Sequence, residues 1–401
     1  MVCALSNDPR ILFFSPDTGG TGIDGPLTNA INLARSFGDA NLPGIFVYNG
    51  REEVFDRFVA TGADVRRAPF PISSLKTHLN PIYRRRYSKI LARYLRAEQI
   101  DVVHLFPRAT YVLHYLEGIN VFKVAQQPYS SPDLRPIRLF ENGFSLRPRN
   151  LLNAWYRKYV RFSYSRADLV SGIGNSHRAA STKVFGIPEH KTAVVRPGIT
   201  PQKQLANPGA VRREFGIACD VKIVLSVGRI TRPKGVEEFG EIARLLHERG
   251  KTYRFLFAGY SFDDAYEANI RERYGQFVTF MGHRDDIPNC MEDSDLYLHP
   301  SHREGLPLAI MESMEFGLPA VAWDIPGCNE LIVDGSTGAL PEFGDVTAAA
   351  NAIEELLDNP AAYEKSSAAT VERFNERHKI SEYAPRLMRI YKEAMARSER
   401  D

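Results

Sequence analysis

The stretch from His299 to Trp323, HPSHREGLPLAIMESMEFGLPAVAW, contains the unit on which the fold is built. The apolar run LYLHPS (296–301) predicts a strand that leads into it, and a helix is expected to begin near Pro307, since proline suits a first helical position. Gly317, followed by a proline, predicts the end of that helix. PAVAW (319–323) then reads as the next strand, so the segment predicts a parallel β-α-β unit.

The same alternation extends in both directions and predicts an α/β protein with two doubly wound parallel sheets. The alternation of strands and helices restarts after VVRPGIT (194–200), which predicts a domain boundary there. We therefore expect one Rossmann-like domain over 1–198, joined by a C-terminal helix at about 382–401 that crosses back to it, and a second over 199–381. The two sheets should face an interdomain cleft, because open sheets bind ligands beyond the carboxyl ends of their strands. The predicted strands are 11–15, 44–49, 101–106, 121–125 and 168–174 in the first series, and 222–228, 253–259, 277–282, 296–301 and 319–323 in the second.

Composition excludes several classes of protein. Apolar residues make up 44% and charged residues 25% of the 401 residues, as in ordinary globular chains. No apolar run approaches the length of a membrane span, and MVCALSNDPR lacks the features of a signal peptide, so we expect a cytoplasmic protein. The 4 cysteines are scattered, which argues against a disulfide framework or a zinc site.

Charge is distributed unevenly along the chain. Residues 1–200 contain 27 lysines and arginines against 15 acids, while the remainder contains 24 against 33. The segment 66–96 has nine basic residues and no acid, interleaved with apolar residues. It either makes a peripheral contact with an acidic membrane on its inner face, or guides an anionic acceptor, or simply covers the sheet. No nucleic-acid-binding motif accompanies it.

Two carboxylates and two cations mark a candidate site in the second half. Glu304 precedes the helix that begins near Pro307 and Glu312 lies on it, so roughly 12 Å at most separates them. The free backbone N–H groups at the start of that helix form an anion site. Arg229 and Lys234, in SVGRITRPKG, could stabilise a diphosphate without a divalent metal. The alternative is that both are ordinary surface cations.

These residues resemble the retaining glycosyltransferases of family 4, which have the GT-B fold. The resemblance rests on Glu304-x7-Glu312, on Arg229 with Lys234-Gly235, and on the segments GGTGIDGPLTNAINLARSF, VVRPGI and PGCNELIVDGSTG. It implies transfer of a sugar from a nucleoside diphosphate sugar to an acceptor hydroxyl with retained configuration, in glycan, polysaccharide or glycolipid synthesis. It also implies that Glu304 touches the donor sugar, Glu312 the ribose, and the two cations the leaving phosphates.

The resemblance further implies two sets of ligand contacts. The first domain should bind a glycan, lipid-linked or small-molecule acceptor, and the second the nucleotide sugar. One departure stands out, because Gln126 and Gln127 occupy the place where many relatives carry a histidine. The expected donor contacts besides Glu312 are Gly20, Gly22, Gly282, His283, Gly305, Leu306 and Leu308, and the expected acceptor or sugar contacts are Asp24, Gln126 and Gln127.

Two other readings remain open at this point. Gly20-x-Gly22-x-x-Gly25 fits a dinucleotide fingerprint, so an NAD(P)-dependent oxidoreductase is an alternative, although the second strand ends in Asn49 and not in an acid. A non-catalytic sugar-nucleotide-binding protein is another. Asp293-Ser294-Asp295 matches a metal-binding D-x-D, but its position before a strand favours a structural turn. We expect no metal and no cofactor besides the donor substrate.

Overall fold

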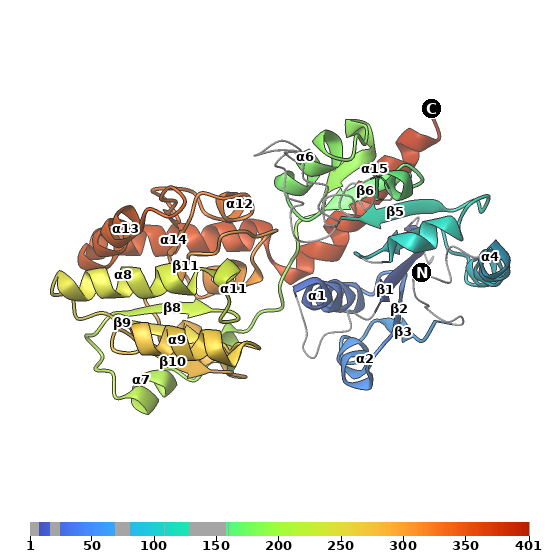
Figure 1. The fold of residues 1–401 in the computed structure, drawn as a ribbon. Coiled ribbons are helices and arrows are strands. Elements are labelled where there is room, and N and C mark those ends of the chain that lie inside the picture. The colour runs from blue at the N-terminus through green and yellow to red at the C-terminus, as the bar shows by residue number, and fades with distance from the viewer. Residues whose placement is uncertain are drawn as a thin grey trace, which may run out of the picture. The chain divides into compact units, whose positions relative to one another are not determined.

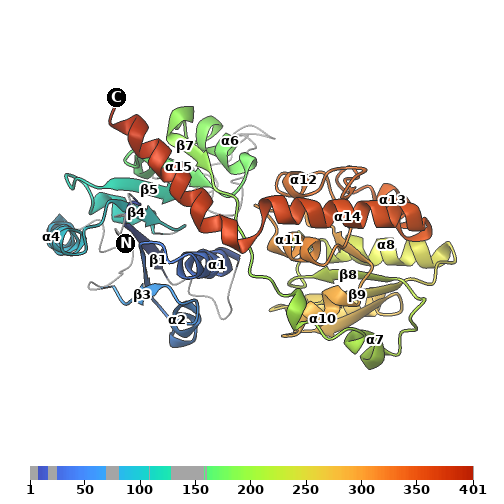
Figure 2. The same cartoon turned by 180° about the vertical axis from the view of Figure 1, so that it is seen from behind.

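The computed structural model describes residues 8–16, 25–68, 81–107, 109–127, 158 and 160–400 (Figures 1 and 2). It divides into two compact units, the first comprising Met1–Gly198 with Ile380–Asp401 and the second Ile199–Lys379. Each unit is built around one parallel sheet. The prediction of two doubly wound parallel sheets is confirmed.

The sheet of the first unit has the order β3-β2-β1-β4-β5-β6-β7, and each neighbouring pair is parallel. All five predicted strands of the first series form, within one or two residues at their ends. β3 and β7 were not predicted. The strands are β1 (Ile11–Pro16), β2 (Gly44–Asn49), β3 (Asp64–Arg66), β4 (Val102–Leu105), β5 (Phe122–Gln126), β6 (Leu169–Gly172) and β7 (Thr192–Val194).

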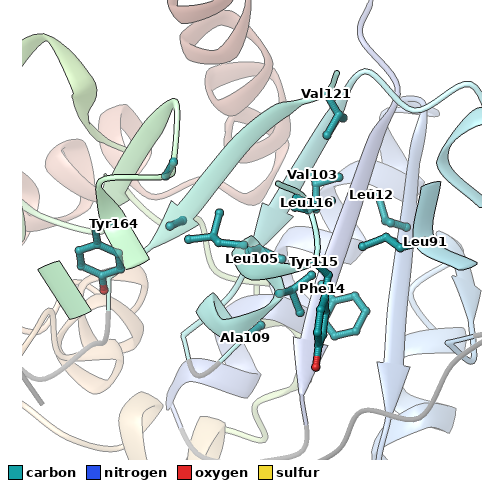
Figure 3. Close-up of a cluster of buried hydrophobic side chains, with 14 of the residues drawn as sticks. Leu12, Phe14, Leu91, Val103, Leu105, Ala109, Tyr115, Leu116, Val121 and Tyr164 are labelled. Atoms are coloured by element: carbon teal, nitrogen blue, oxygen red, sulfur yellow. The ribbon is translucent and has the colours of Figure 1, made fainter. Parts of the chain in front are cut away.

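Helices cover both faces of this sheet, so its central strands are apolar on both sides. Alternate residues of β1 face opposite ways: Phe13 packs in a core cluster with α1 and α15, while Leu12 packs in another with Leu91 of α4. Figure 3 shows Leu91 beside Leu12 in the second cluster. The helices of the unit are α1 (Gly25–Asp39), α2 (Glu52–Val59), α4 (Pro81–Ala97), α6 (Asn175–Lys183) and α15 (Tyr383–Ser398), with short 3-10 turns η1 (Thr110–His114), η2 (Glu189–Lys191) and η5 (Ile380–Glu382).

The sheet of the second unit has the order β10-β9-β8-β11-β12-β13, again parallel throughout. Its five predicted strands form, and the two-residue β13 is additional. The strands are β8 (Ile223–Val227), β9 (Arg254–Ala258), β10 (Val278–Gly282), β11 (Leu296–His299), β12 (Ala320–Ala322) and β13 (Gly338–Ala339). The helices are α7 (Ala210–Phe215), α8 (Val236–Glu248), α9 (Asp264–Tyr274), α10 (Ile287–Glu292), α11 (Leu308–Glu315), α12 (Cys328–Leu331), α13 (Val346–Asp358) and α14 (Pro360–Arg377), with 3-10 turns η3 (Lys203–Leu205) and η4 (Arg232–Lys234).

Two separate helices lie in the C-terminal part of the described chain, and the second corresponds to the helix expected at about 382–401. α14 ends at Arg377, and a new helix, α15, begins at Tyr383 after η5. Ser36 of α1 fixes this start, because its hydroxyl donates to the Ile380 carbonyl (2.6 Å) and accepts from the Ala384 N–H (2.9 Å). α15 then lies along the sheet of the first unit in both views (Figures 1 and 2).

Some of the predicted site residues fall outside the described residues, namely Gly20, Gly22 and Asp24. Among the helices that the structure does describe, none is long and apolar enough to span a bilayer.

Leu387→Ala tests whether α15 belongs to the core of the first unit. Leu387 is 0% exposed there, so we expect a loss of about 2–5 kcal/mol in the free energy of unfolding. Hydrogen-exchange mass spectrometry should show faster exchange in α1, β1 and β4. The matched control is Arg389→Ala, an exposed position on the same helix. Faster exchange confined to 199–379 would contradict the assignment.

Candidate functional site

Two loops meet at the carboxyl ends of β8 and β11, which are neighbours in the second sheet. The close approach of the two loops depends on Gly235. Its φ of +66° is left-handed, and a Cβ there would lie 1.8 Å from the Pro300 carbonyl oxygen. A backbone hydrogen bond from the His302 N–H to the Pro233 carbonyl (2.9 Å) joins the same loops. Residues that are some 70 positions apart in sequence are thereby brought into contact.

Glu304 is the centre of this contact. Lys234 Nζ donates to Glu304 Oε1 at 2.7 Å, and His299 Nε2 lies 3.0 Å from the same oxygen. Only 12% of the Glu304 side chain is exposed. Within the described residues Oε2 has no recorded partner, so this oxygen is available to accept a hydrogen bond from a ligand.

The environment keeps Glu304 ionised. Burial alone would raise the pKa of its carboxyl, but the hydrogen bond and charge of His299, together with Lys234, hold that pKa well below the ordinary value. Lys234 uses one of its three ammonium hydrogens on Glu304. The remaining hydrogens can be donated to an anion, and the carboxylate still carries a free oxygen.

α11 begins at Leu308, four residues after Glu304, and lacks a side-chain cap. Pro307, the expected first helical position, is its N-cap, so the helix begins one residue later than expected. In the part of the chain that the structure describes, no partner is recorded for the backbone N–H groups of Gly305, Leu306 and Leu308. Gly327, at φ +96°, supports this turn so closely that a Cβ would lie 2.5 Å from the Gly305 carbonyl oxygen. The three donors are available to bind an anion at the start of the helix.

Glu312, on α11, differs from its neighbour Glu315. The Glu315 carboxylate accepts the backbone N–H groups of Gln202 and Lys203 at 2.9 Å, so it has a structural task. No hydrogen bond or ion pair is recorded for Glu312 among the described residues, although its side chain is partly buried. Burial, and to a lesser extent the charge of Glu315, raise the pKa of Glu312 to about 7. Such an unsatisfied carboxyl is a candidate ligand contact.

The other predicted donor residues of this unit lie at the ends of β8 and β10. Arg229 is exposed and has no ion pair within the described residues. Gly282 ends β10 at φ +73°, and its carbonyl accepts the Gly259 N–H at 2.8 Å. The His283 side chain is 65% exposed, lies 3.3 Å from Asp285 and packs edge-on against Tyr260. Neither His283 nor Arg229 touches Glu304 in this structure.

In the first unit the predicted glutamines are buried. His104 lies between Gln126 and Tyr391: its Nε2 is 2.9 Å from Gln126 Oε1, and its Nδ1 contacts the tyrosine hydroxyl. Burial lowers the pKa of His104 to about 4, so the neutral ring donates from Nε2 and accepts at Nδ1. Gln127 Oε1 accepts from Ser181 at 2.7 Å, whereas its buried Nε2 has no partner among the described residues. Both amides are thus oriented from within the unit.

Two histidines for which the sequence predicts no role make hydrogen bonds in the candidate site. His299 hydrogen bonds to Glu304, and His302 Nε2 lies 2.7 Å from Glu238 at the start of α8. The signal for His299 was its position at the last residue of a strand, five residues before Glu304. Such a histidine can reach the loop that its own strand enters.

Asp293 and Asp295 have structural partners. Asp293 accepts the Val211 N–H (2.8 Å) and the Arg212 N–H (3.1 Å) at the start of α7, and Asp295 binds Lys222 and the Ile223 N–H. This agrees with the expected turn. Across the described residues, no group of three or more His, Cys, Asp and Glu side chains is placed to hold a metal.

A hollow of about 580 Å³ opens beside η4 and is lined by Thr231, Arg232, Ser261 and Tyr266 among others. It does not include Lys234, Glu304 or Glu312. The hollow therefore does not coincide with the Lys234–Glu304 contact or with the start of α11.

Two family profiles match the chain, one for each unit. "Glycosyltransferase Family 4" matches residues 28–203, and "Glycosyl transferases group 1" matches residues 210–386. The chain belongs to the family 4 glycosyltransferases. The predicted family membership is thus confirmed.

Curated relatives of this glycosyltransferase include the alpha-D-kanosaminyltransferase of Streptomyces kanamyceticus, 32% identical over 47% of this chain and 50% of that protein. Another is the UDP-Gal:alpha-D-GlcNAc-diphosphoundecaprenol alpha-1,3-galactosyltransferase of Escherichia coli, which is 24% identical over 67% of this chain and 69% of that protein. The first relatives are matched over only about half of their own length.

Solved structures show the GT-B fold of this family member. A glycosyltransferase from Rickettsia africae superposes with a TM-score of 0.75 at 18% identity, covering 97% of this chain and 99% of that one. Anabaena HepE, solved in complex with UDP, gives a TM-score of 0.74 at 17% identity, covering 96% and 100%. The predicted fold class is confirmed.

Glu312→Gln should reveal the cost of the buried carboxyl. Folding raises the pKa of Glu312 from an ordinary value near 4.5 to about 7, so the folded protein binds this proton more tightly than the unfolded chain. Stability from this group is present below about pH 4.5 and is lost as pH rises towards 7. The variant should therefore be more stable than wild type by about 3 kcal/mol at pH 8, with the gain shrinking towards pH 5.

Urea denaturation at both pH values measures this difference. Glu315→Gln is the matched control. It should destabilise the protein at both pH values, because it weakens the hydrogen bonds from the backbone N–H groups of Gln202 and Lys203. A pH-independent effect of Glu312→Gln would contradict the raised pKa.

Proposed function

We propose that this protein transfers a sugar from a nucleoside diphosphate sugar to an acceptor hydroxyl, with retention of configuration and without a metal. One observation carries the proposal: the Lys234–Glu304 pair lies beside the uncapped start of α11. The site offers cationic and N–H donors to a diphosphate, and next to them a carboxylate oxygen to a sugar hydroxyl.

Each residue has a distinct task in this proposal. Lys234, Arg229 and the N–H groups of Gly305, Leu306 and Leu308 bind the diphosphate and stabilise the charge that develops on it as it leaves. Glu304 Oε2 accepts from the donor sugar, and Glu312 from the ribose. Gly282 and His283 contact the nucleobase. The two carboxylates select for sugar and ribose hydroxyl groups, which donate hydrogen bonds to them. Lys234 offsets the repulsion between Glu304 and the phosphates.

The reaction needs no protein nucleophile in this scheme. The acceptor oxygen forms a bond to the anomeric carbon on the face from which the bond to phosphate breaks. The departing phosphate oxygen takes the acceptor proton, and the diphosphate takes the electron pair of the broken bond. Family resemblance supports this front-face course, since the retaining enzymes of family 4 share the Glu-x7-Glu pattern.

Fixed cations support metal independence. Lys234 and Arg229 supply positive charge where a divalent ion would otherwise neutralise the diphosphate. The one D-x-D sequence is engaged with backbone N–H groups and with Lys222.

For the donor we propose uridine diphosphate as the nucleotide, and for the acceptor a hydroxyl group in glycan synthesis. The support is that HepE is solved with UDP and that the E. coli relative is named for UDP-galactose. We assign nucleotide binding to residues 199–379 and acceptor binding to the first unit, and we place the reaction in the cytoplasm. An oxidoreductase is not favoured: Asn49, at the end of β2, uses Oδ1 to accept the Ala68 N–H (2.6 Å) and offers no carboxylate to a ribose.

Lys234→Ala tests the leaving-group role. Removing a cation that acts in the transition state should lower kcat by about 10²–10³-fold, whereas Lys251→Ala, which breaks an exposed pair with Asp358, should leave it unchanged. Hydrolysis or transfer assayed with labelled UDP-sugars gives the rates. Equal activity of both variants would refute the assignment, and full inhibition of wild type by a chelator would refute metal independence.

Nucleotide-dependent thermal shifts separate the three candidate functions. UDP at 100 times its Kd should add about 2.7 kcal/mol to the stability of the folded protein and raise its Tm, while NAD should not. A shift with NAD alone supports an oxidoreductase. A shift with UDP but no turnover of any UDP-sugar or GDP-sugar in a panel supports a binding protein.

A further inference from the structure

Helix α4 accounts for most of the basic segment 66–96 and has two different faces. Its sequence, PIYRRRYSKILARYLRA, contains six basic residues and no acid. Tyr87, Leu91 and Leu95 lie on the face that packs into the core of the first unit (Figure 3 shows Leu91). The apolar half of the helix is therefore explained by the sheet that it covers.

The basic residues of the segment fall into separate groups. Arg66 pairs with Asp64 and Glu98 at 2.7 Å, Arg67 pairs with Glu52, and Arg84 pairs with Glu117. Lys76 lies outside the described residues. The remaining five are exposed and have no ion pair within the described part of the chain; they are Arg85, Arg86, Lys89, Arg93 and Arg96.

These five cations form one stripe, which we call the basic face of α4. At 100° per residue they fall within a sector of roughly 100°, opposite Leu91, and they extend for about 17 Å along the helix. Ile82, 77% exposed, lies in the middle of the same sector at the start of the helix, and the adjacent Tyr83 is 41% exposed. Unneutralised charge and the exposed Ile82 side chain thus share one side of the helix.

We propose that the basic face of α4 docks on an anionic lipid bilayer. Lysine and arginine are attracted to acidic headgroups, and the exposed apolar side chains at the start of the helix gain by entering the interfacial region. A nucleic acid would neutralise the cations, whereas a bilayer also offers an apolar phase to the exposed Ile82 side chain. The charge and the exposed apolar end together favour a membrane. The inference does not depend on the proposed reaction.

Vesicle co-sedimentation tests the proposal with the full chain. Wild type should bind vesicles of phosphatidylcholine with 30–40% phosphatidylglycerol, as a rough working range, fail to bind phosphatidylcholine alone, and dissociate at high salt. R86E/K89E/R93E should lower the partition coefficient by at least about 100-fold. R86Q/K89Q/R93Q should lower it less, and Ile82→Ser should lower it without changing the salt dependence.

K183E/K365E/R389E is the matched control, since it makes the same change in net charge at exposed cations away from α4. It should bind vesicles like wild type. Failure of wild type to bind acidic vesicles, equal loss in the control, or binding to duplex DNA but not to vesicles would each overturn the proposal. Hydrolysis of a water-soluble UDP-sugar should be unchanged in the basic-face variants, which separates this result from the proposed catalytic function.

Discussion

The close approach of Gly235 to the Pro300 carbonyl is the constraint on which the candidate site depends. Parallel pairing of β8 with β11 brings two loops to one edge of the sheet, but pairing alone leaves side chains between them. A residue without a Cβ at φ +66° removes that separation, so Lys234 reaches Glu304 at 2.7 Å. The glycine after the lysine is thus part of the site, because it determines where the lysine can lie.

The two glutamates of the site show how a protein tolerates buried charge in different ways. Glu304 keeps its charge, because a lysine and a histidine share one of its oxygens. Glu312 has no such partner among the described residues, and burial raises the pKa of its carboxyl to about 7. The first carboxylate is therefore paired within its own unit, whereas the second can accept a hydrogen bond from a ligand.

Sequence predicted the long strands and the charged residues of the site, and it did so for physical reasons. Apolar runs such as 222–228 must be buried on both faces, and this leaves a strong pattern. β3, β7 and β13 have two or three residues each, too few for a period to be seen. The break before α15 depends on Ser36, more than 340 residues away, and the hydrogen bond of His299 depends on a loop turning back on its own strand. Contacts of this kind leave no pattern in the local sequence.

Because α15 completes the core of the first unit, that core cannot form fully until residues 383–398 have been synthesised. Tyr383, Leu387 and Tyr391 fill that core, yet a ribosome adds them after the whole of residues 199–379. The second unit, which is continuous in sequence, can collapse during synthesis. The core of the first unit can therefore be completed only after residues 383–391 have been added.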